Sequence, residues 1–562
     1  MLSQLLYPNL SFLPRFLVDL FTGFLIVYAL RLALIAFNRS RLLRNATTGP
    51  IVYLSNLPGP KSPSWLWGSE WEMYNTSPGQ KYMEWYHTFG RIFKFKGALG
   101  SSFVTLADPS AIHHILSPQH CYEFPKPEGE RQFFYTLLGK GMIWAEGLTH
   151  SRQRKILGPA FSSGALASLS TIFFDSSYKV VRAWNTLFEQ SSSDSLTIDV
   201  QRWANHISLD TIGLAGFSYD FGTLDPNRPQ HPLARTLDGF TDSSGTHSFS
   251  AFLVHSLIWA FPAILRIPSN RQKALSKSRN MLAEITNKVW AERKALSNPQ
   301  GSGKSILELL LKAEKPGSAS NLTKEQIAAE MMTLIFAGYE TTATIIAWAL
   351  YELATHPEIQ EELRRQVTDI SLSDPSFEDL HNGLPLLSAV VNETLRFHPT
   401  FMQIHREASK DSLLPLTPLP QEFTQTGITP TTGTHLFVPK GTILILPINI
   451  MQSSEDVWGP DAHIWNPYRW MDIGATGKEA NESKQTQWRK DLLIFSTGAR
   501  GCIGHNFAKL EIKTVLATLL RNFAFAPADN NEIEPLLSFV VRPKVKGEHR
   551  SSLPLKITRL NY

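Results

Sequence analysis

The chain has 562 residues, of which 43% are hydrophobic and 18% are charged, and its formal net charge is +5. This composition supports a large folded core. The small net charge, without a basic run that is interleaved with aromatic residues, argues against a nucleic-acid-binding protein. Cys121 and Cys502 are the two cysteines. A secreted protein of this length usually carries several disulfides, so the composition favours a reducing compartment.

The first feature along the chain is an apolar segment, Phe16–Phe37, which is long enough to cross a bilayer as a helix, about 33 Å at 1.5 Å per residue. More arginines follow this segment than precede it, so the positive-inside rule predicts a lumenal N-terminus at 1–15 and a cytosolic remainder. A cleaved signal peptide is the alternative, but its apolar region would be shorter. Residues 38–63 are basic and then proline-rich and predict a linker. Residues 64–562 show no internal repeat and are expected to form one domain.

Short-range patterns predict several elements of this domain. Residues 91–96 alternate polar and apolar side chains and predict a strand that pairs with residues 101–107. Asp108 followed by Pro109 predicts the start of a short helix. Five further stretches are predicted in the same way: a polar loop at 191–195, an apolar helix at 252–267, enlarged loops at 415–435 and 473–487, and a strand at 442–450.

A long helix is predicted from Thr323 to Thr355, because Thr323 and Gln326 form a capping box and His356-Pro357 ends the pattern. Its middle is apolar on nearly all sides, so we expect it to cross the core. Gly338, Glu340 and Thr341 lie in that middle, where the threonine hydroxyl can bond back to the backbone and a local distortion is expected. A buried carboxylate needs a reason, and a notch for close packing is the alternative interpretation.

Two pairs of charged residues have helical spacing. His150 and Arg154 are four apart and share one face, which taken alone is typical of a solvated basic surface. Glu393 and Arg396 are three apart on a helix that ends before Pro399, a spacing that suits an ion pair.

The most informative stretch is Phe495-Ser-Thr-Gly-Ala-Arg-Gly-Cys-Ile-Gly-His505, where three glycines surround Cys502 and an amphipathic run follows. Glycines permit a tight turn, and a cysteine just before a helix sits at the positive end of the helix dipole. Together with the charge of Arg500, this position favours the thiolate. An inert buried cysteine is the alternative.

This stretch resembles the haem-binding loop of the cytochrome P-450 family, Phe-x-x-Gly-x-Arg-x-Cys-x-Gly. Phe495, Gly498, Arg500, Cys502 and Gly504 match every fixed position. The resemblance covers the chain from about Leu57 to the C-terminus. It implies a mainly α fold with small β-rich regions behind the N-terminal transmembrane helix. It also implies a haem b cofactor whose iron is ligated by Cys502.

The resemblance also assigns roles outside the loop. Arg406 and the pair His150 and Arg154 match positions that reach the haem propionates, although His150 stands where the family often has tryptophan. Glu340 and Thr341 resemble the acid–alcohol pair of the oxygen-binding helix and are the expected catalytic residues, which pass protons to the bound oxygen.

The resemblance implies three further sets of residues. Glu393, Arg396 and Arg469 are expected to form a buried cluster. The substrate pocket is expected to include Phe133, Phe134, Leu137, Phe336, Met402 and Ile404. The surface on which the electron-donating partner docks is expected to include Arg152, Arg154, Lys155, Lys509 and Lys513.

The implied function is that of a monooxygenase in the membrane of the endoplasmic reticulum, with its catalytic domain at 64–562. It would use O2 to oxidise a bulky apolar substrate, such as a terpenoid or polyketide of secondary metabolism. No nucleotide-binding or flavin motif is present, so electrons are expected from NADPH–cytochrome P-450 reductase. Two alternatives remain open: a haem-thiolate isomerase or dehydratase that needs no reductase, and a non-catalytic haem- or lipid-binding protein.

Overall fold

The computed structural model describes residues 51–244, 248–261, 305–314, 321–370, 373–417, 433–471, 492–528 and 531–560, and part of 279–295. The predicted anchor at 16–37 lies outside the described residues. So do most of the enlarged loop at 415–435 and all of the one at 473–487.

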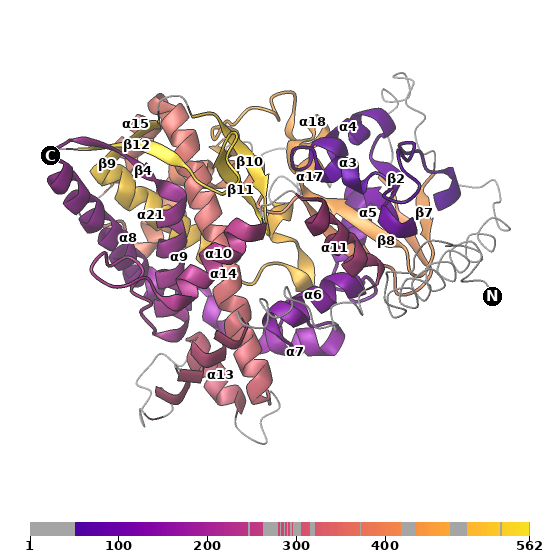
Figure 1. Cartoon of the computed structure of the whole chain (residues 1–562), viewed down its shortest axis with the longest axis horizontal. Coiled ribbons are helices and arrows are strands. Elements are labelled where there is room, and N and C mark those ends of the chain that lie inside the picture. Colours follow the sequence, from indigo (N-terminus) through magenta and orange to yellow (C-terminus); the bar gives the residue numbers. More distant parts are fainter. Residues whose placement is uncertain are drawn as a thin grey trace, which may run out of the picture.

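The described chain is mainly helical, as the sequence predicted (Figure 1). Its α-helices are α3 (Glu70–Tyr74), α4 (Gln80–Phe89), α5 (Pro109–Leu116), α6 (Glu128–Leu138), α7 (Gly147–Leu157), α8 (Ser163–Ser191), α9 (Val200–Phe217), α10 (Pro232–Ser244), α11 (Phe249–Ala260), α13 (Ile306–Glu314), α14 (Lys324–Thr355), α15 (Pro357–Asp369), α16 (Pro385–Phe397), α17 (Ile448–Ser453), α18 (Glu455–Trp458) and α21 (His505–Asn522).

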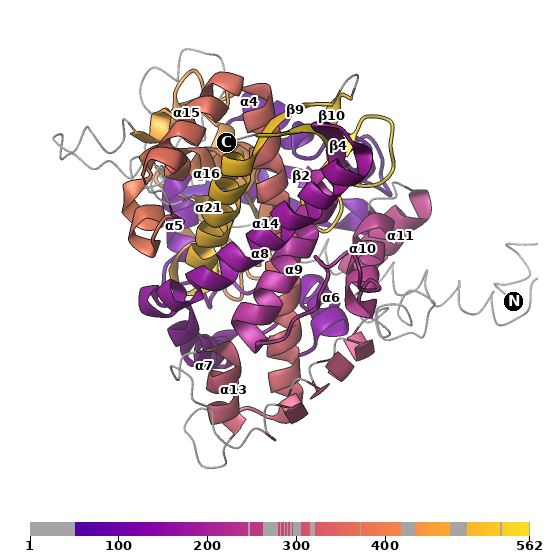
Figure 2. The same ribbon diagram turned by 90° about the vertical axis from the view of Figure 1, so that its left-hand side faces the viewer.

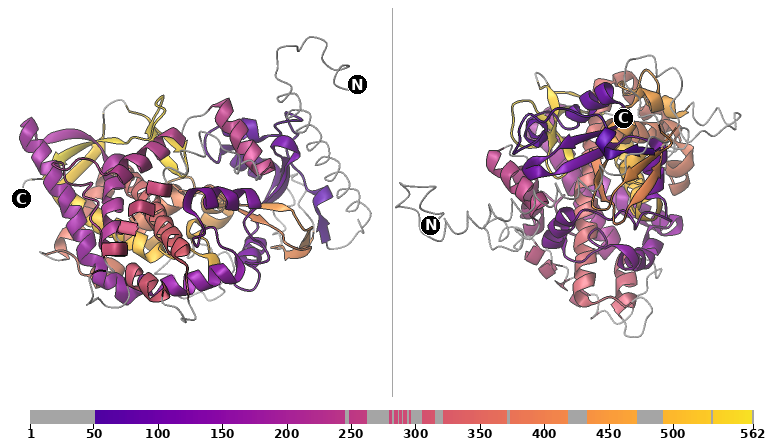
Figure 3. Two further views of the ribbon diagram at one scale, coloured as in Figure 1. Left: turned by 60° about the horizontal axis from the view of Figure 1, so that its bottom comes forward. Right: turned by 90° about the vertical axis from the view of Figure 1, so that its right-hand side faces the viewer.

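The strands form four small sheets. Their bounds are β1 (Ile51–Tyr53), β2 (Ile92–Lys96), β3 (Ser102–Leu106), β4 (Ser195–Asp199), β5 (Gln403–Glu407), β6 (Ser412–Pro415), β7 (His435–Val438), β8 (Ile443–Pro447), β9 (Phe523–Pro527), β10 (Ile533–Leu537), β11 (Val541–Val545) and β12 (Pro554–Arg559). The sheet orders are β2-β3-β8-β5, β1-β7-β6, β4-β12-β9 and β10-β11. Early and late strands therefore lie side by side, as the β-rich end in the right panel of Figure 3 shows.

The first β-rich region agrees with the pattern in the sequence. β2 and β3 pair antiparallel, with Phe95 opposite Phe103. The carboxylate of Asp108 accepts a hydrogen bond from the Ala111 N–H and so caps α5. The predicted strand at 442–450 was too long, because β8 ends at Pro447 and α17 begins immediately after it. An apolar run by itself does not distinguish a buried strand from a buried helix.

Helix α14 runs through the middle of the helical part and packs against α9, α16 and α21 (Figures 1 and 2). The predicted capping box is present, with Thr323 and Gln326 each bonding to the other's backbone N–H. Among the described residues, α14 is the one helix that is long and apolar enough to cross a membrane, but 83% of its most apolar window is buried in the protein. It is therefore a core helix. Helix α14 is continuous through Gly338, where a local distortion was expected.

The predicted charged cluster is confirmed in geometry. Both carboxylate oxygens of Glu393 accept hydrogen bonds from Arg396, at 2.7 and 2.8 Å, and Arg469 adds a third at 3.0 Å. The indole of Trp470 and the backbone N–H of Asn466 also donate to this carboxylate. Arg396 in turn donates to three backbone carbonyls in the segment 452–464. The cluster thus fastens α16 to the chain that leads toward the Cys502 loop.

We expect Glu393→Ala to give little folded protein. It would leave buried arginines without their carboxylate, and breaking a buried ion pair costs about 3–5 kcal/mol. Chemical denaturation and haem content of the purified protein measure this effect. Glu128→Ala is the matched control, because Glu128 pairs with Arg131 at the same spacing on the surface, where the loss is about 1 kcal/mol or less. A well-folded Glu393→Ala protein that lost only turnover would contradict this structural role.

Candidate active site

The loop before α21 is held by its own backbone. Cys502 donates its N–H to the Phe495 carbonyl at 2.6 Å, and Gly501 donates to the Gly498 carbonyl at 3.1 Å. Gly498 has φ +66°, and a Cβ atom there would lie 2.2 Å from the carbonyl oxygen of Leu116. The glycine is therefore required both by the left-handed backbone and by the close approach of α5. Gly504 caps α21, so Cys502 lies just before a helix, as predicted.

The thiol of Cys502 retains accessible surface although protein atoms surround it on most sides. Burial raises the pKa of the Cys502 thiol, while the Gly504 N–H and the charge of Arg154 act in the opposite direction. The expected lowering of this pKa by the helix end and Arg500 is therefore not what the protein alone provides. A metal ion that coordinates a thiol favours its thiolate form.

Arg500 points away from the thiol and into a charged network. Its guanidinium donates to the Glu146 carboxylate and, at 3.3 Å, to the Cys121 carbonyl, and it lies 4.8 Å from the centre of the Tyr122 ring. Glu146 also accepts a hydrogen bond from Lys126 at 3.1 Å. Burial opposes ionisation of Glu146, but Lys126 and Arg500 hold its pKa below the usual value. Cys121 itself is a free, fully buried cysteine.

The two predicted propionate-binding residues of α7 lie beside this network but do different things. Arg154 donates to the Gly501 carbonyl and so contacts the cysteine loop directly. His150 is buried, with Nδ1 2.9 Å from the Tyr122 hydroxyl. Burial, and then the charges of Arg500 and Lys126, lower the pKa of His150 to about 4. Its imidazole is therefore neutral near pH 7 and has hydrogen-bonding capacity but no charge.

Arg406 on β5 supplies the clearest sign that the site is built for an anion. It is buried, it donates to the His405 carbonyl at 2.7 Å, and its Nε has no partner among the described residues. Nη1 of Arg500 is likewise buried and unpartnered. Burial and the neighbouring charge of Arg500 lower the pKa of Arg406 to about 10. Unsatisfied buried cations of this kind fit the two carboxylates of haem b, and the Cys502 thiol fits its iron.

Helix α14 carries a short stretch that is less buried than the residues around it. Ala337 is exposed, and Gly338 and Thr341 are half-buried, whereas most of the helix around them is fully buried. The Thr341 hydroxyl donates to the Ala337 carbonyl at 2.7 Å. A helix in the centre of the core shows exposed residues only where it borders an internal space, so this stretch suits an oxygen-binding site.

Glu340 lies differently from Thr341. Its carboxylate is 1% exposed and lies 2.6 Å from Nη2 of Arg542 on β11. Ser538 is 3.5 Å from the same oxygen, Oε1, while Oε2 has no partner among the described residues. Burial raises the pKa of Glu340 and Arg542 acts against that shift. The structure thus places no hydrogen bond between Glu340 and Thr341.

Three of the predicted pocket residues gather around a ring that sequence reasoning missed. Phe539, in the turn between β10 and β11, has its ring centroid 4.9 Å from that of Phe336, 6.2 Å from that of Phe134 and 6.4 Å from that of Phe133. Phe401 adds a fourth contact at 5.9 Å. Phe336 directly precedes the exposed Ala337 on α14, so this phenylalanine cluster borders the exposed stretch of that helix. Its composition suits an apolar substrate.

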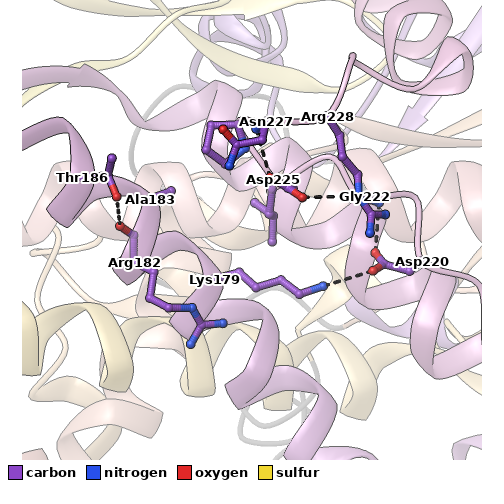
Figure 4. Close-up of a pocket in the computed structure, with 11 residues that line it drawn as sticks. Lys179, Arg182, Ala183, Thr186, Asp220, Gly222, Asp225, Asn227 and Arg228 are labelled. Atoms are coloured by element: carbon purple, nitrogen blue, oxygen red, sulfur yellow. Dashed lines mark hydrogen bonds and ion pairs between the residues drawn. The ribbon is translucent and has the colours of Figure 1, made fainter. Parts of the chain in front are cut away.

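A separate cavity of about 320 Å³ lies between α8 and the loop that follows α9 and shares no residue with this site. Lys179 pairs with Asp220 at 3.5 Å across it, and Arg228 pairs with Asp225 at 3.3 Å (Figure 4). Its charged lining does not suit an apolar substrate.

The sequence also gave no sign of Glu146, Tyr122, Lys126 or Arg542. Each acts through a partner far away in the chain, and no local motif marks such a pairing. Of these residues, Glu146 was the easiest to anticipate from the sequence, because it comes just before the predicted helix that carries His150.

A mainly helical fold with a cysteine loop at the start of a core helix, buried cations beside it and a threonine-bearing helix across the core defines a haem-thiolate enzyme. Comparison with known proteins agrees: the cytochrome P-450 family model matches residues 58–425 and 416–550. The chain belongs to the cytochrome P-450 family. It is accordingly an oxygen-incorporating oxidoreductase whose haem iron is bound through a cysteine thiolate.

Three of the similar curated proteins come from Ampulloclitocybe clavipes, Postia placenta and Ganoderma lucidum. The chain is 37% identical over 530 residues to cytochrome P-450 monooxygenase claP of Ampulloclitocybe clavipes, which covers 92% of this chain and 95% of that protein. It is 31% identical to cytochrome P-450 monooxygenase 128 of Postia placenta, with 92% and 94% covered. It is 30% identical to ganoderic acid synthetase CYP5150L8 of Ganoderma lucidum, with 84% and 88% covered.

We expect Gly498→Ala to lower the haem content of the purified protein, because the added methyl group meets the Leu116 carbonyl. The reduced carbon-monoxide spectrum then shows a smaller thiolate-type Soret band, and Cys502→Ala, which removes the expected ligand, sets the zero of that scale. Gly547→Ala is the matched control, since Gly547 has φ +86° but open space around its Cβ position. Both variants strain the backbone by about 1–2 kcal/mol. Equal haem loading in the two would show that the contact with α5 does not matter.

Proposed function

We propose that the protein is a membrane-anchored monooxygenase that inserts one oxygen atom of O2 into a bulky apolar substrate of secondary metabolism, a terpenoid or polyketide. The observation that carries the substrate class is the phenylalanine cluster beside the exposed stretch of α14. A biosynthetic role is supported by the relative named ganoderic acid synthetase. When bound, haem supplies the activation of O2.

The residues of the chain hold the cofactor in this proposal. Cys502 ligates the iron, and Arg406 and Arg500 offer their unpartnered N–H groups to the carboxylates. His150 reaches the same carboxylates as a neutral donor, while Arg154 fixes the cysteine loop through the Gly501 carbonyl. Phe495 and Gly504 shape the loop and the start of α21. The network of Glu146 and Lys126 keeps Arg500 oriented.

The membrane orientation is supported by exposed aromatic residues. Trp65, which follows the linker directly, is 81% exposed, and Phe249 at the start of α11 is 50% exposed. Phe249 and Phe252 pack against Trp67 and Trp71, so the linker end and α11 form one apolar face. Such a face beside a predicted anchor suits contact with the bilayer surface. The catalytic domain is then cytosolic, at the membrane of the endoplasmic reticulum.

Electrons come, in this proposal, from NADPH–cytochrome P-450 reductase, which docks near the cysteine loop. Arg152 and Lys155 are exposed on α7, and Lys509 lies on α21 beside the Phe495 ring. Lys513 does not belong to this surface, because it is buried and donates to the Leu380 carbonyl at 2.7 Å. The expectation for that residue was wrong, since its face of α21 packs inward.

The proposed function predicts a product that is heavier than its substrate by one oxygen atom. Microsomes that carry the full chain and a reductase are incubated with host extract and NADPH, and mass spectrometry compares them with a Cys502→Ala sample. Protease added outside intact microsomes abolishes the new product if the catalytic domain is cytosolic. A product that forms without NADPH would instead favour a haem-thiolate isomerase.

Thr341 and Glu340 are proposed to control protons rather than substrate affinity. The Thr341 hydroxyl lies on the exposed stretch of α14, where it can pass a proton to bound oxygen, and Oε2 of Glu340 is free to receive one from water. Oε1 of Glu340 is occupied by Arg542, so the carboxylate reaches the threonine through water in this scheme.

We expect Thr341→Ala to keep the carbon-monoxide spectrum and to keep consuming NADPH, while product falls and hydrogen peroxide rises. A positioned acid contributes about 100- to 10,000-fold, of which water can replace a part. Thr344→Ala is the control, since Thr344 makes the same kind of backbone bond, to the Glu340 carbonyl, but is fully buried. Unchanged product per NADPH in both Thr341→Ala and Glu340→Gln would remove the relay and return this stretch to a packing notch.

A further inference from the structure

The position of the β10–β11 hairpin depends on contacts with other elements. It is an isolated two-stranded sheet, with Leu536 paired to Arg542 and Leu537 to Val541. Two strands alone are marginally stable in water, so contacts with the rest of the protein must fix the hairpin. The hairpin lies beside α14 in Figure 1, and its turn carries Phe539 into the phenylalanine cluster. The position of that ring therefore depends on whatever holds the hairpin.

One buried charge pair joins the hairpin directly to α14. Arg542 on β11 and Glu340 on α14 are both 1% exposed, and their charged atoms lie 2.6 Å apart. The other ion pairs of the hairpin, Lys544 with Glu534 and Lys546 with Glu532, join its own two strands and do not reach α14. The Val541 N–H donates to the Thr400 carbonyl at 2.9 Å, which adds a second tie at the base of the turn.

The pair and the ring are linked by a short stretch of rigid structure. Two residues separate Phe539 from Arg542. Ser538, at the start of the turn, lies 3.5 Å from the same oxygen of Glu340. On α14, Phe336 and Glu340 are one turn apart, so they lie on the same face of the helix. The ion pair and the contact between Phe336 and Phe539 therefore join the same two elements at neighbouring points.

We propose that Arg542 is a positioning residue of the active site: through its ion pair with Glu340 it fixes the β10–β11 hairpin on α14 and so sets where Phe539 sits in the substrate pocket. This deepens the proposed function, because it rests on the phenylalanine cluster as the apolar substrate site. It also gives Glu340 a second task besides the proton relay. Arg542 itself touches neither substrate nor cofactor in this arrangement.

The test uses the haem-loaded full chain and two probes that bind haem iron, imidazole and the larger 4-phenylimidazole. The ratio of their dissociation constants, followed by the shift of the Soret band, reports the space in the pocket and needs no known substrate. Phe539→Ala is expected to change this ratio about two- to tenfold, the range of one aromatic contact. Arg542→Gln should change it by a similar factor, and Arg542→Lys, which keeps the charge, should restore part of the change.

The combined variant Phe539→Ala/Arg542→Gln separates positioning from general damage. If Arg542 acts through the ring, the second substitution adds no further change, whereas multiplied effects would overturn the proposal. Lys546→Gln removes the same charge from the exposed side of the hairpin and should leave the ratio at its wild-type value. Hydrogen exchange of the Val541 amide should accelerate in Arg542→Gln and not in Lys546→Gln.

A loss of folding is covered by a second variant. Arg542→Gln leaves Glu340 buried and unpaired, so it can fail to load haem; Glu340→Gln/Arg542→Gln removes both charges and is then compared with Phe539→Ala in the same way. A wild-type ratio in that variant, or in Arg542→Gln itself, overturns the proposal. Because neither probe is a substrate, failure to find an oxygenated product counts against the proposed function and not against this role of Arg542.

Discussion

Two buried arginines, Arg406 and Arg500, place more positive charge beside the cysteine loop than the nearby carboxylates neutralise. Burial of a cation costs free energy unless it is paired, and each guanidinium keeps a nitrogen without a partner among the described residues. Glu146 is shared between Arg500 and Lys126, so it does not compensate both. The unpartnered guanidinium nitrogens of these two arginines suit the carboxylates of haem b. The lowered pKa of His150 follows first from its burial and then from the same excess of positive charge.

Helix α14 carries the other half of the site. It connects elements that are distant from one another in the sequence. Tyr339 donates its hydroxyl to Asp238 on α10, and the adjacent Glu340 pairs with Arg542 on β11. These two neighbouring residues therefore connect α14 to two different elements, α10 and β11. Thr341, the next residue, is left on the exposed stretch. Buried polar groups of this helix bond either to a distant partner, as Tyr339 does, or to a carbonyl of the helix itself, as Thr344 does.

The Glu393 cluster and the Glu340 pair show how similar motifs differ in predictability. The partners of Glu393 could be assigned because the family resemblance supplied both arginines, and the structure confirms each of them. For Glu340 the same resemblance pointed to Thr341 and said nothing of Arg542. In the structure, the Glu340 carboxylate instead pairs with Arg542 of the β10–β11 hairpin. Phe539 was not predicted for the same reason, since no motif near it in the chain marks it as a pocket residue.

The sequence by itself determined the elements whose cause is local: the capping box of α14, the β2–β3 hairpin, the cap of α5 and the turn at Gly498. These follow from hydrogen bonds and steric limits that act over a few residues. Only the tertiary structure decided that Arg500 pairs with Glu146, that Lys513 is buried and that Arg542 meets Glu340. The chain offers many arginines, lysines and carboxylates of equal chemistry, and which of them are desolvated together is settled by the packing of elements that are distant in sequence.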